Sequence, residues 1–116
     1  MEIKLEEYDY YIHSGYTDMR KQARTLALLV QNEMELNPFD RSIFVFCGKT
    51  RTIIKALCWN GNGWLEIIKR METGERFHWP TDAQAARKTD LDTIIGTLKG
   101  YNMWKPFTSA KPSRVG

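Results

Sequence analysis

The chain has 116 residues, a net charge of +3 and a hydrophobic content of 42%, values that are ordinary for one globular domain. No apolar run reaches the length of a membrane span, and the first residues lack the pattern of a secretion signal. We therefore expect a cytoplasmic protein with a single domain over residues 1–104 and a loose tail over 105–116. Cys47 and Cys58 are too few for a disulfide framework and lack zinc-site spacing.

Charge is distributed unevenly along the chain. Residues 1–40 carry four basic and eight acidic side chains, whereas residues 41–76 carry seven basic and three acidic ones. A basic central part favours a polyanion such as nucleic acid over an acidic partner. A normally solvated surface explains the same pattern, so charge alone does not identify the partner.

The first third of the sequence predicts a short strand and then a long helix. Residues 8–12 are rich in tyrosine and are typical of a strand. Thr17 is placed to cap a helix over 18–36, and Asp18 suits its positively polarised start. Apolar residues recur in this stretch at steps of three and four, which places them on one helical stripe.

Beyond residue 40 the period becomes that of strands. Four short segments are separated by gaps of hairpin length, at 42–47, 52–59, 64–71 and 75–79. A second, shorter helix is expected over 90–99, with Thr89 as its cap and Gly100 at its end. The predicted class is α+β, with a four- to five-stranded antiparallel meander sheet, one long N-terminal helix and one short C-terminal helix.

The hairpin loops predict which residues share a sheet face. The loop around Gly61 sets Trp59 opposite Trp64, and a tight turn at 73–74 would set Ile68 opposite Trp79. With Cys47 taken opposite Ile53, one face collects the aromatic and basic residues Lys55, Leu57, Trp59, Trp64, Glu66, Ile68, Arg70, Phe77 and Trp79. The other face collects Phe44, Phe46, Ile54, Ala56, Cys58, Leu65 and Ile67, a cleaner core that the long helix is expected to cover. In this register the two cysteines point to opposite faces.

An aromatic and basic sheet face is suited to nucleic acid, because bases stack on rings and cations meet phosphates. The candidate nucleic-acid-binding residues are Lys49, Arg51, Lys55, Trp59, Trp64, Lys69, Arg70, Arg76 and Trp79. The alternative is structural: the rings pack under the second helix or in a dimer interface, while Lys55 and Arg70 pair with Glu66. The loop at 48–52 lacks the glycines and the following helix of a phosphate loop, which favours a solvated hairpin tip over a phosphate contact through its backbone and Lys49 or Arg51.

Residues that carry catalysis are scarce. His13 and His78 lack the spaced partners that a metal site requires, and both cysteines lie in apolar strand patterns where thiols tend to be inert. Asp18 and Arg20 follow a tight turn, which a capped helix start explains without any catalytic role. We expect no enzyme, no metal, no cofactor, no small-molecule substrate and no membrane partner.

Several separate motifs, in order and at fixed spacing, resemble a known family. They cover about residues 10–100 and read GYTDMRK at 15–21, LALLV at 26–30, NPFDRSIFVFCGKTRTIIKALCWNGNGW at 37–64, KRMETGERFHWP at 69–80 and TDLDTIIGTLKG at 89–100. The chain is similar to the accessory protein encoded by the second reading frame of the IS-sixty-six group of bacterial insertion sequences, often labelled TnpB. It departs from the usual family pattern at Gln22, Asn60 and Trp64-Leu65.

The resemblance implies a role in transposition beside a separate, larger transposase that carries the metal-dependent strand chemistry. It assigns no role to the residues of the first motif, Gly15, Tyr16, Thr17, Asp18, Met19, Arg20 and Lys21. We expect the chain to bind element DNA, the transposase of the same element, or both. The competing hypothesis is a pure protein-interaction module that docks on the transposase or on a second copy of itself without contacting nucleic acid. A small nuclease dependent on Asp18 is a third possibility.

Overall fold

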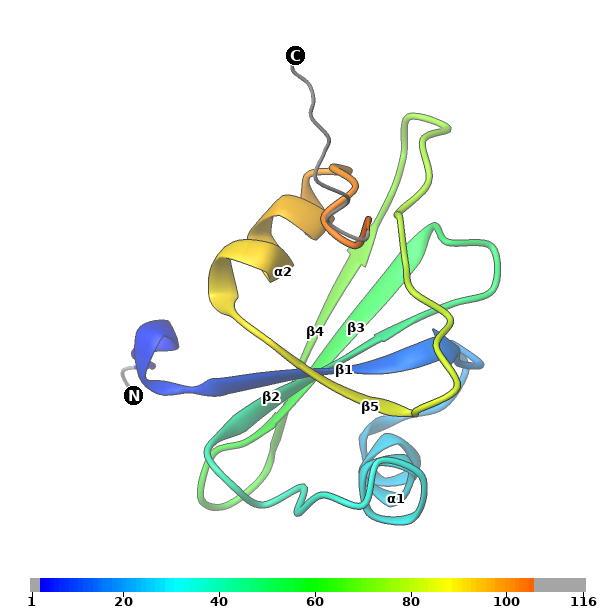
Figure 1. Ribbon diagram of the computed structural model, residues 1–116. Coiled ribbons are helices and arrows are strands. Elements are labelled where there is room, and N and C mark those ends of the chain that lie inside the picture. The colour runs from blue at the N-terminus through cyan, green and yellow to red at the C-terminus, as the bar shows by residue number, and fades with distance from the viewer. Residues whose placement is uncertain (1–2, 106–116) are drawn as a thin grey trace.

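The computed structural model describes residues 3–105, so the expected tail lies outside the described residues apart from Lys105. Its elements, in chain order, are a short 3-10 helix η1 (Leu5–Glu7), β1 (Asp9–Tyr16), α1 (Ala23–Asn32), β2 (Ser42–Cys47), β3 (Ile53–Trp59), β4 (Trp64–Arg70), β5 (Ala86–Thr89) and α2 (Leu91–Leu98) (Figure 1). Among the described residues, no helix has the length and apolar content needed to cross a bilayer.

The five strands form one sheet in the order β4-β3-β2-β1-β5, which confirms the α+β class. Strands β2, β3 and β4 make the predicted antiparallel meander. Strand β1 differs from the prediction because it runs parallel to β2, with Asp9 opposite Ser42. The reason is the helical crossover: α1 returns the chain to the end of the sheet where β1 began, and two neighbouring strands joined in this way are parallel.

Residues 75–79 were predicted to be a strand of the meander, and this prediction is wrong. The backbone N–H of Phe77 donates to the carbonyl of Arg51 (2.7 Å), and that of Gly15 donates to the carbonyl of Pro80 (2.9 Å). These bonds tie the segment to the β2–β3 loop and to the end of β1 instead of to β4. The fifth strand is β5, which pairs antiparallel with β1 at the opposite edge of the sheet.

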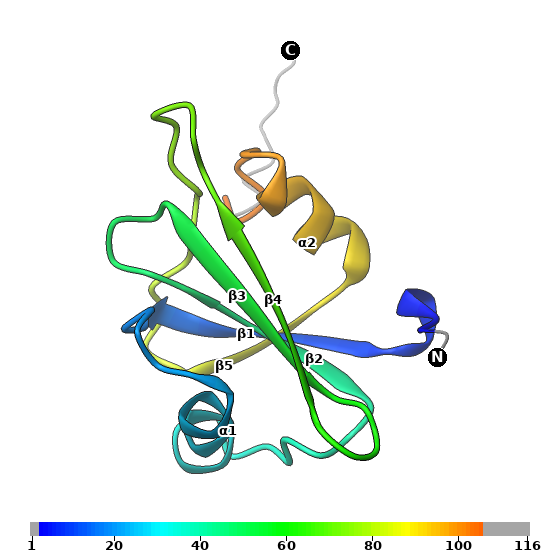
Figure 2. The same ribbon diagram turned by 180° about the vertical axis from the view of Figure 1, so that it is seen from behind.

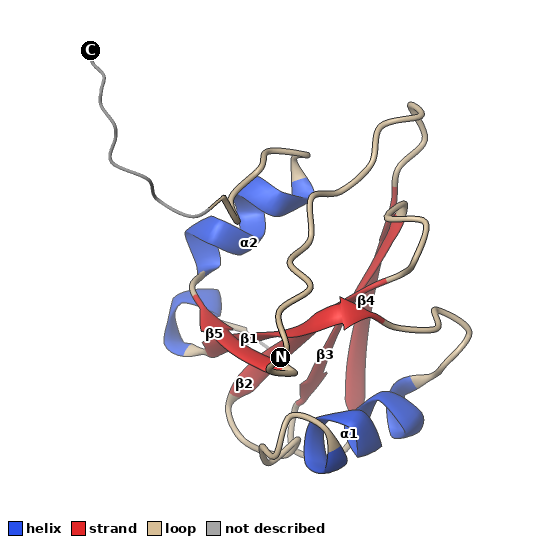
Figure 3. Ribbon diagram, turned by 45° about the vertical axis from the view of Figure 1, so that its right-hand side comes forward, coloured by secondary structure: helices blue, strands red, loops and turns tan. Residues whose placement is uncertain are grey.

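The two helices lie on opposite sides of the sheet (Figure 3). On one side, α1 packs Leu26 and Val30 against the strands, and Met34, just after the helix, joins them. On the other side, α2 contributes Ile94 to a second cluster. The α1-side cluster contains Leu26, Ala27, Val30, Met34, Phe44, Phe46 and Leu57, and the α2-side cluster contains Tyr10, Ile12, Ile43, Val45, Cys47, Ile54, Cys58, Phe77, Trp79 and Ile94.

The β2–β3 register differs from the prediction by one residue. Cys47 pairs with Ile54 instead of Ile53, so Phe44 lies opposite Leu57. Because side chains alternate along a strand, this shift moves the phenylalanines of β2 onto the face that carries Lys55. Helix α1 therefore covers the face of Leu57, whereas the prediction had placed it over Ile54. Both cysteines consequently share one face, contrary to the predicted register, and both are free thiols.

Both helices begin later than predicted. Helix α1 starts at Ala23 after Gln22, whose side chain makes no capping hydrogen bond, and it ends at Asn32. The predicted cap, Thr17, precedes this start by several residues, so the long helix over 18–36 is wrong at both ends. Helix α2 is capped by Asp90, whose carboxylate accepts from the N–H of Thr93 at 2.8 Å. The predicted cap at Thr89 is thus wrong by one residue.

Candidate functional site

The motif at 15–21 leaves β1 and lies against the loop that follows β2. The N–H of Thr17 donates to the carbonyl of Cys47 at 2.9 Å. Met19 leaves no room for a side chain at Gly48, because a Cβ at this position would lie 2.6 Å from Cγ of Met19. Two segments that the sequence singled out separately, the family motif and the loop at 48–52, therefore form one surface.

A shallow pocket of about 460 Å³ opens between these two segments. Its lining comprises Tyr16, Thr17, Asp18, Met19, Gly48, Lys49, Thr50 and Ile53. Thr17 is buried, and its hydroxyl has no hydrogen-bond partner among the described residues. Asp18 is paired with Arg20, Oδ2 to Nη2 at 2.8 Å, and hydrogen bonds from Arg20 hold the pKa of this exposed carboxyl well below its usual range. The carboxylate is therefore charged at neutral pH and is paired with the Arg20 guanidinium.

The described residues contain no group of three or more His, Cys, Asp or Glu side chains that is arranged to hold a metal ion. Burial raises the pKa of Cys47 to about 12 and also raises that of Cys58. Both thiols are therefore protonated at neutral pH, and a thiol in that state is a poor nucleophile.

Cations from two segments meet at one end of the sheet. Nη1 of Arg76 donates to the carbonyl of Thr50 at 3.3 Å, which places the 76–77 segment against the β2–β3 loop. Lys49 and Arg76 are exposed and Arg51 is half-buried. Within the described residues none of these three forms an ion pair. We call Lys49, Arg51 and Arg76 the basic end.

The backbone at the tip of the basic end is unusual. Arg51 has a φ of 59°, in the left-handed region that few residues with a side chain adopt. Its N–H donates to the carbonyl of Gly48 at 2.9 Å, and its own carbonyl accepts from Phe77. The loop is therefore a fixed turn, held on both sides by hydrogen bonds.

Lys55 was proposed as a phosphate contact, but the structure buries it. Its side chain is 10% exposed; Nζ donates to the carbonyl of Lys21 at 2.8 Å and lies 3.8 Å from Oε1 of Glu66. A cation held in this way supports the fold and does not face solvent. The pairing with Glu66 that the sequence left open as an alternative is present, although its second proposed member, Arg70, is not part of it.

The two remaining basic candidates lie on β4. Lys69 donates through Nζ to the carbonyl of Leu98 at 2.6 Å, which joins β4 to the end of α2. Arg70 is exposed, lies opposite Ile53, and forms no ion pair in the described part of the chain. Because successive side chains of a strand point to opposite faces, these two cations do not act on the same side of the sheet.

An aromatic cluster lies at the other end of β3. The rings of Trp59 and Trp64 are 4.9 Å apart, as the predicted hairpin register required. Phe39 completes the cluster, with ring centroids 5.1 Å from Trp59 and 5.3 Å from Trp64, and it is 53% exposed. Phe39 was not among the predicted site residues, because it lies in the connection between α1 and β2, outside any periodic apolar pattern.

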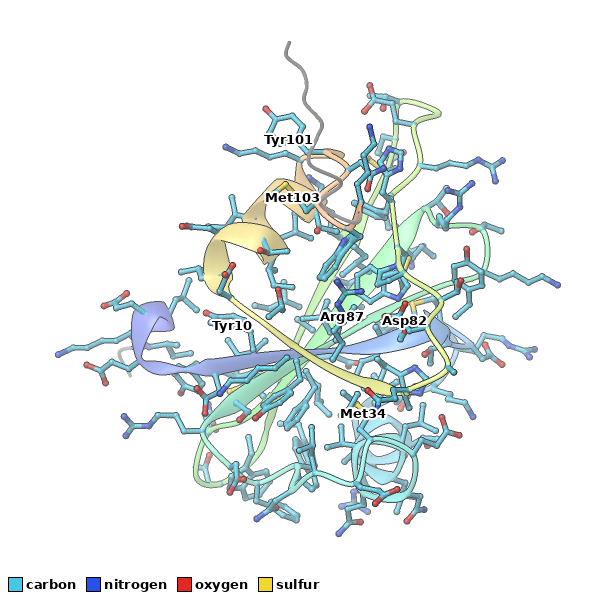
Figure 4. The ribbon with its side chains drawn as sticks, viewed as in Figure 1. Tyr10, Met34, Asp82, Arg87, Tyr101 and Met103 are labelled. Carbon is cyan, nitrogen blue, oxygen red and sulfur yellow. The ribbon has the colours of Figure 1, made fainter. Side chains whose placement is uncertain are left out.

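Trp79 does not join this cluster, so the prediction of one aromatic face with three tryptophans is wrong. It is 7% exposed on the α2 side of the sheet, and its indole N–H donates to the carbonyls of His13 and Gly15, both at 3.0 Å. The ring of Trp104 lies 6.0 Å away, beneath Arg87. Arg87 is also paired with Asp82 at 2.8 Å (Figure 4). The structure therefore assigns Trp79 to the core.

The cationic and aromatic candidates are thus separated. Six residue steps along β3, roughly 20 Å, divide Ile53 beside the basic loop from Trp59 in the cluster. The molecule offers two exposed surfaces of different chemistry at opposite ends of one sheet, in place of the predicted single plate.

The fold and its surface define a small α+β protein with a cationic loop at one end of its sheet and an aromatic cluster at the other. The family model described as IS66 Orf2 like protein matches residues 8–107, and the chain belongs to this family of insertion-sequence accessory proteins. It is 34% identical over 106 residues to the uncharacterized protein y4hO of Sinorhizobium fredii, with 91% of each chain covered. No solved structure matches.

Proposed function

We propose that this accessory protein binds the DNA of its insertion sequence through the basic end. The observation that carries the proposal is the convergence of Lys49, Arg51 and Arg76 from two segments, with none of them in an ion pair among the described residues. Cations that are not neutralised by an ion pair can replace the counterions of phosphates, and this release of counterions drives binding to the DNA backbone.

The fold also limits how DNA is held. Helix α1 covers one face of the sheet and α2 lies over the other, so bases do not stack on the sheet centre (Figure 3). The basic loop projects from the sheet end on a rigid turn, which suits contacts to phosphates more than to base edges. The proposed binding is therefore largely independent of sequence and falls as salt rises.

A salt series with a fluorescent duplex of arbitrary sequence, and with a single strand of the same length, tests the proposal. The variant Lys49→Gln, Arg51→Gln, Arg76→Gln is expected to bind more weakly, and the magnitude of the salt slope is expected to fall by about one for each phosphate contact removed. The matched control is Lys4→Gln, Arg24→Gln, Lys99→Gln, which removes the same charge from exposed positions elsewhere. Equal losses in the two variants, or no salt-sensitive binding by the wild type, contradict the proposal.

The exposed aromatic cluster favours a second candidate function, docking on the transposase of the same element. Solvent-accessible rings in contact with one another are typical of the anchors of protein interfaces. Phe39→Ser is expected to abolish co-purification with the transposase in the presence of nuclease, whereas the basic-end variant retains it. If nuclease alone abolishes co-purification of the wild type, DNA bridges the two proteins and the docking function fails.

A further inference from the structure

Strand β4 forms one outer edge of the sheet, and in the described part of the chain no segment pairs with its outer side (Figure 2). Five of its seven residues, 66–70, are exposed. They include two isoleucines on opposite faces, Ile67 at 65% and Ile68 at 46% exposed. An edge strand of this length with apolar side chains readily pairs with another strand, unless charges or bulges prevent it.

The backbone hydrogen bonds fix which groups of β4 face outward. The N–H of Met71 donates to the carbonyl of Thr52, and the N–H of Asn60 donates to that of Gly63. In an antiparallel ladder such bonds recur at every second residue, so in the β3–β4 register residues 65, 67 and 69 bond to β3. The N–H and C=O groups of residues 64, 66, 68 and 70 therefore point outward and are available to a partner strand.

We propose that β4 pairs antiparallel with β4 of a second copy, around a two-fold axis that passes through Ile68. In this register Ile68 faces its own equivalent, and Glu66 of each copy faces Arg70 of the other. The outward-pointing residues are then the ones that pair, as the hydrogen-bond pattern requires. The result is a continuous ten-stranded sheet.

The charges of Glu66 and Arg70 favour this register over the adjacent registers of the two β4 strands. An axis through Glu66 would set the two carboxylates against each other, and an axis through Ile67 would set Glu66 opposite an isoleucine. Only the axis at Ile68 gives two opposite-charge pairs. Glu66 has one ionic contact of 3.8 Å, to Lys55, and Arg70 has none among the described residues, so both can accept the new contact.

The apolar surface beside the edge enlarges the contact. A pocket of about 170 Å³ lies between α2 and the sheet, and its lining includes Ile67 from β4 together with Ile95 and Leu98 from α2. Ile95 is 40% exposed. On the α1 side of the edge, Trp64 packs against the α1 cluster, whereas Ile68 is 46% exposed and its side chain is accessible to the second copy.

Cysteine cross-linking of full-length protein without DNA tests both the dimer and its register. Ile68→Cys is expected to form a disulfide-linked dimer under mild oxidation, because paired residues on adjacent strands have a Cα separation within disulfide range. Ile67→Cys is the matched control. In the proposed register, position 67 lies opposite Lys69 of the second copy and only diagonally from position 67 of that copy, so slower cross-linking is expected. The wild type gives the background, and its cysteines are both buried. Faster cross-linking of Ile67→Cys than of Ile68→Cys overturns the register.

Sedimentation over a wide range of protein concentration tests the dimer without modification. The wild type is expected to reach twice the mass of one chain, and Arg70→Glu, which sets two carboxylates opposite each other, is expected to weaken the dimer by about tenfold. Adding Glu66→Gln removes the repulsion and is expected to restore part of the loss. A wild type that stays monomeric at every concentration overturns the proposal. The experiment contains no DNA, so a monomeric result would not count against the proposed DNA binding.

Discussion

The buried amine of Lys55 donates a hydrogen bond to the carbonyl oxygen of Lys21, 2.8 Å away. This bond joins the end of the family motif to a central strand of the sheet. The motif also bonds to the end of β2 through Thr17 and touches Gly48 through Met19. The motif is thus attached to the sheet along its length, and its residues hold the basic loop in place as well as lining the pocket beside it.

Replacing Lys55 by methionine separates this structural role from phosphate binding. The change leaves the half-buried Lys21 carbonyl and the Glu66 carboxylate without this donor, so the free energy of unfolding is expected to fall by about 1–3 kcal/mol. Lys49→Met, at an exposed position, is expected to change stability by no more than about 0.5 kcal/mol. Urea unfolding measures both. Equal stabilities for the two variants would show that the Lys55 contact contributes nothing.

The indole N–H of Trp79 is the next feature to test. Trp79→Phe keeps the aromatic ring but leaves the carbonyls of His13 and Gly15 without this donor, and a loss of about 1–3 kcal/mol is expected. Trp59→Phe serves as the control, because Trp59 is only half-buried and its ring contacts Phe39 and Trp64 at the surface cluster. Thermal unfolding compares them. A larger drop in Tm for Trp59→Phe contradicts the assignment of Trp79 to the core.

Gly48→Ala tests the close approach of the motif to the loop. The added methyl collides with the Met19 side chain, whose Cγ would lie 2.6 Å from it, and the overpacking is expected to cost about 1–3 kcal/mol. The double variant Gly48→Ala, Met19→Ala removes the obstruction, so its cost is expected to be smaller than the sum of the two single costs. Additive losses in denaturant unfolding would mean that the two side chains do not share this space.

Asp90 supplies a pH-dependent contribution to stability. Its hydrogen bonds with Thr93 hold its pKa below the ordinary carboxyl value, so the stabilisation is present at neutral pH and is lost as pH falls through the folded-state pKa. Asp90→Ala is expected to cost about 1 kcal/mol at neutral pH through loss of the cap. Asp90→Asn keeps an acceptor without the titration, and its stability is expected to fall less steeply with acid. Identical acid profiles for wild type and Asp90→Asn contradict this account.

Local patterns predicted the parts of the fold that depend on neighbours in sequence. Short runs of strand-favouring residues, separated by gaps of hairpin length, identified β2, β3 and β4, and the loop around Gly61 correctly set Trp59 opposite Trp64. The predicted β2–β3 register was wrong because the observed one depends on Arg51 adopting a left-handed backbone conformation. Residues with a side chain rarely adopt this conformation, so the sequence did not indicate it. The parallel pairing of β1 with β2 was not predicted, because it rests on contacts between residues distant along the chain.

The candidate site was predictable in part. The basic residues of the loop at 48–52 were recognised, and Lys49 is exposed as expected. Trp79 and Lys55 were misplaced because composition does not distinguish an interior aromatic or an interior amine from an exposed one. Their burial depends on partners, the carbonyls of His13 and Lys21, that belong to other elements. The sequence does not show which backbone carbonyl a side chain will reach in the folded protein.

Residues 71–85 connect the two opposite edges of the sheet, from β4 to β5. Strand β5 has four residues, β1 is its single partner strand within residues 3–105, and α2 follows it directly. A short outer strand and the helix behind it tend to open as one cooperative unit, ahead of the rest of the domain. Amide hydrogen exchange should therefore release β5 and α2 together while β2 and β3 remain protected. The molecule would then retain β1–β4 and α1 as a partly unfolded intermediate with the apolar side of β2 uncovered.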